Sequence, residues 1–362
     1  MLGLYIHIPF CVSKCYYCDF VSYADCGKLV PAYLEALKKE AFFYQKFTAP
    51  QTVYIGGGTP SFLSCAQIEG LLDFVNKNYG GNFKEFTFEC NPESLTEEKL
   101  AILKSGGVNR ISLGLQSFNN GELKLAGRAH NARQFLKAYH TTRKYFDNIN
   151  IDLIAALPKQ TKKTFTGSLK KVIALKPKHI SVYGLQIEEN TALYKNGYSY
   201  DDGFYVELLE MAYQTLTEAG FKQYEISNYA LPGFESLHNI NYWQSGQYIG
   251  LGAAAGGFLN GERYGNLIGV KEYINCVKRG KRPLEFKETL TGKAKTGEEI
   301  MLALRYLKGF KPAAGMLKFF RKDFEELIKD GLIEKDKEIL KLSRQGKYFA
   351  NEVFCRFVEP FK

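Results

Sequence analysis

Three closely spaced cysteines near the start of the chain are the clearest chemical signal in the sequence. Cys11, Cys15 and Cys18 lie in the run CVSKCYYC, directly after a short apolar stretch. Cysteine thiolates are the usual ligands of [4Fe–4S] clusters, and three of them so close together can bind three of the four irons. The fourth iron then stays open to a small chelating ligand, because Phe20 occupies the position where a fourth cysteine would stand.

A structural zinc site is the alternative interpretation of these cysteines. Zinc normally takes four ligands, often from two Cys-x2-Cys pairs, and the sequence offers no second pair, although His7 or Cys26 could complete a site. The spacing C-x3-C-x2-C also differs from the C-x2-C-x2-C run of bacterial ferredoxins. The other cysteines are widely spaced, and in a reducing compartment we expect them to be inert thiols.

Glycine and polar residues follow several further apolar runs, at the point where each run ends. Glycine lets the backbone approach a ligand closely, a carboxylate accepts hydrogen bonds from hydroxyls or an ammonium group, and a guanidinium matches a carboxylate. Any one of these residues could be a structural polar group, but their joint position favours a shared binding site. The residues are Gly57, Gly58, Thr59, Glu89, Gln116, Arg128 and Asp152.

The elements that must position these residues follow from hydrophobic periodicity. Six apolar runs predict buried parallel strands over residues 4–8, 52–56, 85–90, 109–115, 149–155 and 179–185. Helical segments separate most of them, the clearest over residues 31–47, and Ser94 with Glu97 fits a capping box at the start of another. The alternation predicts an α/β fold, an incomplete (β/α)6 barrel of the TIM type, whose strand ends share one mouth.

The chain divides into three parts on this pattern. Residues 1–230 form the predicted barrel core, residues 231–290 a linking region, and residues 291–362 a small, mainly helical C-terminal domain. The C-terminal pattern, with a possible hairpin near residues 331–342, is winged-helix-like. Residues 271–362 carry 22 Lys and Arg against 14 Asp and Glu, which indicates contact with something acidic or simply a solvated basic surface.

Composition places the protein in a broad class. Apolar residues make up 45% of the 362 residues and charged residues 24%, as in ordinary globular proteins. No apolar run reaches the ~18 residues that suggest a membrane span, and the first residues, MLGLYIHIPF, lack the features of a secretory signal. We therefore expect a cytoplasmic protein, which could be peripheral at the inner face of the membrane. No basic helix with base-reading side chains stands out, so nucleic acid is not an expected partner.

The stretch YIHIPFCVSKCYYCDF, residues 5–20, resembles the start of the oxygen-independent coproporphyrinogen III oxidase-like family of radical S-adenosylmethionine (SAM) proteins. The resemblance implies a radical SAM barrel with a [4Fe–4S] cluster on the three cysteines and SAM as a cofactor. It also implies that the following residues contact SAM: Tyr5, Tyr17, Gly57, Gly58, Thr59, Glu89, Gln116, Arg128 and Asp152.

Within that family, three features favour the heme chaperones over the oxidases. The oxidases resemble C-x3-C-x2-C-x-C, and Phe20 replaces the last cysteine here. They also carry a long extension before the first strand, whereas only four residues precede Tyr5. Finally, residues 238–243 match the HNxxYW motif of the chaperones.

The HNxxYW motif has a physical rationale as a heme site. His238 would bind the heme iron, because imidazole is a common axial ligand, and Tyr242 and Trp243 could stack on the porphyrin. The same residues could instead be ordinary core residues. Other histidines could also supply the ligand: His7, His130, His140 and His179.

The sequence therefore predicts a chaperone that binds heme and transfers it to an acceptor protein, with a [4Fe–4S] cluster, SAM and heme as cofactors. The expected partners are heme, an acceptor that could be associated with the inner face of a membrane, and, by resemblance, a second copy of the chain. One alternative is the coproporphyrinogen III oxidase, and another is a different radical SAM enzyme that cleaves SAM without binding heme. No catalytic acid or base is predicted.

Overall fold

The computed structural model describes residues 1–47 and 49–358. Its central feature is a twelve-stranded sheet with the strand order β12-β11-β10-β9-β1-β2-β3-β4-β5-β6-β8-β7. The six predicted parallel strands are confirmed as neighbours in chain order. They are β1 (Leu2–Ile8), β2 (Thr52–Gly57), β3 (Glu85–Cys90), β4 (Arg110–Gln116), β5 (Ile149–Ala155) and β6 (His179–Gly184).

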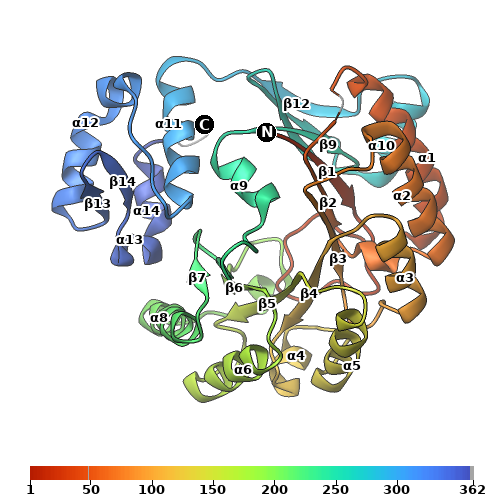
Figure 1. Ribbon diagram of the computed structural model, residues 1–362, viewed down its shortest axis with the longest axis horizontal. Coiled ribbons are helices and arrows are strands. Elements are labelled where there is room, and N and C mark those ends of the chain that lie inside the picture. Colours follow the sequence, from red (N-terminus) through yellow and green to blue (C-terminus); the bar gives the residue numbers. More distant parts are fainter. Residues whose placement is uncertain (48, 359–362) are drawn as a thin grey trace.

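Helices that connect these strands cover the outside of the curved sheet (Figure 1). They bury one apolar stripe each against it, as an amphipathic helix must. The predicted helix over residues 31–47 is shorter than expected, because it gives way to a 3-10 turn, Phe42–Tyr44. The helices are α1 (Val30–Ala41), α2 (Cys65–Tyr79), α3 (Glu97–Ser105), α4 (Asn120–Leu125), α5 (Ala132–Arg143) and α6 (Lys162–Ala174), and α7 (Ala192–Lys195) and α8 (Asp202–Glu218) follow β6.

The start of α3 differs from the prediction. Thr96, not Ser94, caps the helix, and its hydroxyl accepts a hydrogen bond from the backbone N–H of Lys99 at 3.3 Å. The Ser94 hydroxyl lies 2.7 Å from that of Ser61. The predicted capping box is therefore wrong. The Ser94 side chain instead connects the loop before α3 to the turn that follows β2.

Side chains on the parallel strands alternate between the helix layer and the barrel interior. In β1, Leu4, Ile6 and Ile8 are fully buried against the helices. Tyr5 and His7 point the other way, and the Tyr5 hydroxyl lies 2.8 Å from His7 Nδ1. The interior of this barrel is therefore lined by polar side chains, which is where a polar ligand can be held.

Residues 231–290, expected to be a linking region, extend the same sheet. Strand β9 pairs in parallel with β1, and β10, β11 and β12 follow in antiparallel order. Two short strands come just before this part, β7 (Lys222–Gln223) and β8 (Asn228–Ala230). The elements of the part itself are α9 (Leu237–Trp243), β9 (Gln247–Leu251), β10 (Gly256–Leu259), β11 (Glu262–Asn266), α10 (Val270–Lys278) and β12 (Leu284–Glu288).

The C-terminal residues form a separate unit beside the barrel, at the blue end of the colour range in Figure 1. Its own apolar core includes Ile300, Phe320 and Phe324. The predicted hairpin is present as β13 and β14. The elements are α11 (Gly292–Arg305), α12 (Ala314–Lys329), β13 (Ile333–Asp336), β14 (Ile339–Leu342), α13 (Arg344–Tyr348) and α14 (Ala350–Cys355). Within the described residues, no helix has both the length and the apolar character that crossing a membrane requires.

Candidate functional site

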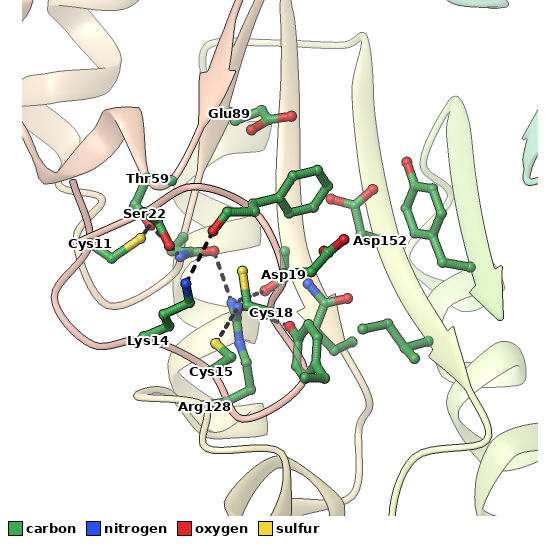
Figure 2. A pocket seen from close by; sticks show the side chains of 18 of the residues that line it. Cys11, Lys14, Cys15, Cys18, Asp19, Ser22, Thr59, Glu89, Arg128 and Asp152 are labelled. Carbon is green, nitrogen blue, oxygen red and sulfur yellow. Dashed lines mark hydrogen bonds between the residues drawn. The ribbon is translucent and has the colours of Figure 1, made fainter. Parts of the chain in front are cut away.

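The three cysteines lie on the loop that follows β1, and the loop folds back on itself. The Cys11 N–H donates to the Tyr23 carbonyl at 3.1 Å, and the Tyr23 N–H donates to the Pro9 carbonyl at 2.8 Å. Cys11, Cys15 and Cys18 all line one pocket at the carboxyl ends of the parallel strands. Figure 2 shows the three thiols in this pocket together with Arg128 and Thr59.

The glycine run after β2 forms the wall beside Cys11. Gly57 has φ of +111°, a conformation that favours glycine. A Cβ atom at Gly58 would lie 2.9 Å from the Phe10 carbonyl oxygen and 3.0 Å from Cys11 Sγ. The Thr59 hydroxyl donates a hydrogen bond to Cys11 Sγ at 3.3 Å. The run is glycine-rich because the two loops touch here, and Thr59 orients the thiol.

Arg128 connects the cysteine loop to the barrel. Its Nη1 lies 3.5 Å from Cys15 Sγ and 3.4 Å from the Tyr17 hydroxyl. Its Nη2 donates to Asn91 Oδ1 at 2.8 Å and to the Gly114 carbonyl at 2.9 Å. Because a guanidinium is always charged, this places a buried positive charge beside the cysteine loop.

Two carboxyl groups line the interior side of the pocket. Glu89 accepts hydrogen bonds from the Tyr54 hydroxyl at 2.6 Å and from the Gly57 N–H at 3.1 Å. Burial raises the pKa of Glu89 to about 7, with a contribution from the nearby Asp152 carboxylate. Burial also raises the pKa of Asp152. Groups poised in this way can accept hydrogen bonds from ligand hydroxyls or an ammonium group.

Two buried polar atoms at the pocket have no hydrogen-bond partner among the described residues, Gln116 Oε1 and Arg128 Nε. Gln116 also has φ of +70°, an uncommon backbone conformation for a side chain of this size. Buried polar groups are normally satisfied, so these atoms indicate that a polar ligand completes the pocket. This observation fits SAM, which carries an amine, a carboxylate and ribose hydroxyls.

The donor set also fits an iron–sulfur cluster. Burial raises the pKa of Cys18 to about 11, with a contribution from Cys15, so its thiol keeps its proton until a metal replaces it. Across residues 1–47 and 49–358, no three His, Cys, Asp or Glu side chains converge enough to hold a single metal ion. A cubane does not require such convergence, because each thiolate binds a different iron.

Most of the predicted site residues are brought together in this pocket, and two are not. The pocket is lined by Cys11, Cys15, Tyr17, Cys18, Gly57, Gly58, Thr59, Glu89, Gln116, Arg128 and Asp152. Tyr5 lies deeper in the barrel and lines a second pocket, together with residues of α9 and of β9 to β12. His238 is 1% exposed, with Nδ1 2.9 Å from Thr52 Oγ1 and Nε2 2.8 Å from the Tyr242 hydroxyl.

Several side chains that line the pocket were not predicted from the sequence, among them Tyr54, Ser112 and Tyr183. The Ser112 hydroxyl donates to Asp152 Oδ2 at 3.2 Å. Tyr54 and Ser112 each lie two residues before a glycine at a strand end, so the period-two alternation of a strand places them on the same inner face. That alternation was the available signal.

Comparisons with known proteins show which proteins this chain resembles. Residues 5–172 match the model of the Radical SAM superfamily. A heme chaperone HemW from Lactococcus lactis is 38% identical over 98% of this chain and 96% of its own length. The heme chaperone HemW from Bacillus subtilis is 36% identical over 99% of both chains, and that of Escherichia coli is 34% identical over 99% and 98%.

A solved structure has the same fold over nearly the whole chain. It is coproporphyrinogen III oxidase (HemN) from Escherichia coli, described as a radical SAM enzyme, with a TM-score of 0.86. The match covers 99% of this chain and 90% of the other, at 23% identity. The barrel and the C-terminal unit described above therefore occur together in another protein.

Proposed function

We propose, because this chain belongs to the heme chaperone HemW family of radical SAM proteins, that it binds heme and passes it to an acceptor protein. The observation that carries the proposal is the similarity to the heme chaperones along almost the entire chain, including the part after the barrel. Phe20, 65% exposed at the pocket, supports the chaperone over the oxidase, because it supplies no fourth thiol near the cluster.

A [4Fe–4S] cluster and SAM are the cofactors of the first pocket. Cys11, Cys15 and Cys18 hold the cluster, and the thiol of Cys11 is oriented by Thr59. A reduced cluster with bound SAM supplies one-electron and radical chemistry. The protein's own contribution is to position the thiols and to place the Arg128 charge beside them.

The remaining residues of the pocket bind SAM through polar groups. Glu89 and Asp152 accept hydrogen bonds from hydroxyl or ammonium groups, and Gln116 both donates and accepts. The free Nε–H of Arg128 is available to the SAM carboxylate. Tyr17, half-buried beside Arg128, contributes an aromatic face to the adenine.

The proposal extends to the partners of the chain. The excess of Lys and Arg in residues 271–362 supports contact with an acidic surface. We propose that the acceptor is a membrane-associated heme protein reached from the cytoplasm, and that the chain acts as a homodimer.

An anaerobic experiment separates the chaperone from the oxidase. The cluster is reconstituted, and the protein is titrated with heme; a second sample receives SAM, a reductant and coproporphyrinogen III. We expect stoichiometric heme binding and no porphyrin-dependent 5′-deoxyadenosine. Protein without a reconstituted cluster is the control. Decarboxylated porphyrinogen with stoichiometric 5′-deoxyadenosine, and no heme binding, would make the protein an oxidase instead.

A further inference from the structure

The neighbouring strands β4 and β5 each end in a strained residue beside the cysteine pocket. Gln116, the last residue of β4, has φ of +70°, and Ala156, directly after β5, has φ of +66°. Residues with a Cβ atom seldom adopt this left-handed conformation, and it persists only where the surrounding structure holds it. Contacts outside the two strands must therefore hold both ends in place.

The two strand ends form one side of the cysteine pocket. Gln116, Asp152 and Ile154 line it, and the buried Oε1 of Gln116 has no partner among the described residues. The register between β4 and β5 shifts between Gly114 and Gln116, and an irregularity of this kind re-aims the side chains beside it. The direction in which Gln116 points thus depends on how firmly the backbone is held at its strained position.

Gln160 holds the turn that leaves β5. Its side chain is buried, and it is not one of the residues that line the pocket. Its Oε1 accepts a hydrogen bond from the Ala156 N–H at 2.7 Å, and its Nε2 donates to the Ile154 carbonyl at 3.1 Å. One side-chain amide is therefore bonded to the backbone at the end of β5 and at the strained residue that follows it.

The same amide reaches the end of β4 through Glu122. Gln160 Nε2 also donates to Glu122 Oε2 at 3.2 Å, and the Ser117 hydroxyl donates to the same oxygen at 2.6 Å. Ser117 directly follows Gln116, and its hydroxyl accepts from the Asn119 N–H at 2.9 Å. A buried network of hydrogen bonds, Gln160–Glu122–Ser117, thus connects the two strained strand ends.

The network also anchors the segment that leads to Arg128. Helix α4 separates Gln116 from Arg128 in the chain, and the Arg128 N–H donates to the Leu123 carbonyl of α4 at 2.9 Å. From α6, the Ser168 hydroxyl accepts from the Phe118 N–H at 3.0 Å. Two of the residues proposed to contact SAM therefore stand at the two ends of a segment that is held from behind the pocket.

We infer that Gln160 is a positioning residue for SAM, and that through Glu122 and Ser117 it holds the ends of β4 and β5 in the arrangement that binds the ligand. The inference rests on the SAM site of the proposed function. Gln160 acts through the backbone of the two strand ends, without touching the ligand. Because residues that bind a ligand depend on the hydrogen bonds that support them, loss of this amide should loosen one side of the pocket and leave the cysteine loop in place.

Asn266 provides a matched control, because it is a second buried amide with equivalent hydrogen bonds. Its side-chain nitrogen donates to a buried glutamate, Glu40, at 2.6 Å and to a backbone carbonyl, that of Gly252, at 2.9 Å. None of these three residues lines the cysteine pocket. Asn266→Leu and Gln160→Leu therefore remove the same kind of contact at different places in the fold.

The test is a calorimetric titration of full-length, cluster-loaded protein with SAM. We expect Gln160→Leu to bind SAM about tenfold more weakly than wild type, the scale of one lost hydrogen bond to a charged group, with its iron content unchanged. Asn266→Leu should bind SAM as wild type does, although both variants should unfold at a lower temperature.

Two further variants test how Gln160 acts. Glycine adopts the left-handed conformation without the penalty that alanine carries, so adding Ala156→Gly to Gln160→Leu should restore part of the lost SAM affinity. Ser117→Ala removes only a hydroxyl from the other end of the network and should weaken SAM binding about threefold. It decides the question if Gln160→Leu does not fold.

The possible outcomes separate the inference from the proposed function. Wild-type SAM affinity in Gln160→Leu or in Ser117→Ala would overturn the inference. An equal loss in Asn266→Leu would also overturn it, because any loss of stability would then weaken binding, and so would a double variant that recovers nothing. A wild type that binds no SAM would overturn the proposed SAM site itself, and the inference with it.

Discussion

Arg128 shows how one buried side chain can serve both cofactors that we propose for the first pocket. Its guanidinium contacts Cys15, Tyr17, Asn91 and Gly114, while its Nε–H has no partner among the described residues. One charged group therefore fixes the cysteine loop against the barrel and keeps a free donor for a carboxylate. The residue was predicted as a SAM contact by resemblance; its bond to the Cys15 thiol is visible only in the structure.

Replacing Arg128 should weaken SAM binding. We expect Arg128→Ala to lose about 2 kcal/mol of SAM binding free energy, the scale of a hydrogen bond to a charged group. Isothermal titration calorimetry on cluster-loaded protein measures this loss. Arg133→Ala, an exposed arginine on α5, is the matched control. Equal affinity in the two variants, with iron content intact, would remove Arg128 from the SAM site.

His238 marks the limit of prediction at the level of single residues. A motif with a histidine beside two aromatic residues indicates a heme ligand. The sequence does not reveal that β1 and β2 present Gly3 and Thr52 to the imidazole ring. Packing of α9 against the barrel interior depends on contacts between residues far apart in the chain. Such contacts leave no local pattern in the sequence.

At the scale of elements, the parallel strands were predictable and the sheet extension was not. Buried strands read as continuous apolar runs, and alternating helices require them to be parallel. Strand β9 has only five residues, and a tertiary contact beside it helps to hold it against β1. Glu40 of α1, fully buried, accepts hydrogen bonds from Gly252 N–H at 2.7 Å, Asn266 Nδ2 at 2.6 Å and the Tyr273 hydroxyl at 2.6 Å.

The Glu40 contacts predict a pH dependence of stability. Burial raises the pKa of Glu40 to about 7. A carboxyl whose pKa is raised on folding stabilises the fold below its unfolded value, and this contribution is lost as pH rises through the folded value. We expect the midpoint of thermal unfolding to fall between about pH 5 and pH 8, and Glu40→Gln to flatten that fall in part. Burial also raises the pKa values of Glu89 and Glu225 to about 7, so these two residues also contribute to the fall of the unfolding midpoint.

A neighbouring glutamate provides the control for this prediction. Glu35 lies on the same helix, with its side chain 66% exposed and paired with Lys38. Glu35→Gln should leave the pH profile as in wild type. A Glu40→Gln profile identical to wild type would show that Glu40 keeps an ordinary carboxyl pKa despite its burial.

At the scale of the whole molecule, the two pockets share a wall. Tyr54 lines the cysteine pocket, and its ring centroid lies 5.3 Å from that of His238 and 6.3 Å from that of Tyr5. Tyr5 and Tyr242 line the second pocket. One layer of aromatic rings therefore separates the cysteine pocket from the second pocket.

The C-terminal unit completes the second pocket. The Arg305 guanidinium lies 5.2 Å from the Trp243 ring and 4.7 Å from the Phe354 ring, so it connects α9 to the C-terminal core. The Leu307 N–H donates to the Tyr224 carbonyl at 3.0 Å across the same boundary. From this unit, Lys295, Glu298, Glu299 and Leu302 line the second pocket.

Transfer of heme tests the central claim most directly. The protein is loaded with heme, separated from free heme and mixed with an excess of an apo-heme protein, and the absorption spectrum of the recipient is followed. We predict that the recipient gains heme and that this chain returns to its heme-free spectrum. The prediction does not depend on whether SAM is cleaved. Heme that stays on the chain in the presence of excess apo-acceptor would contradict the account, since a protein that retains heme is a heme protein and not a chaperone.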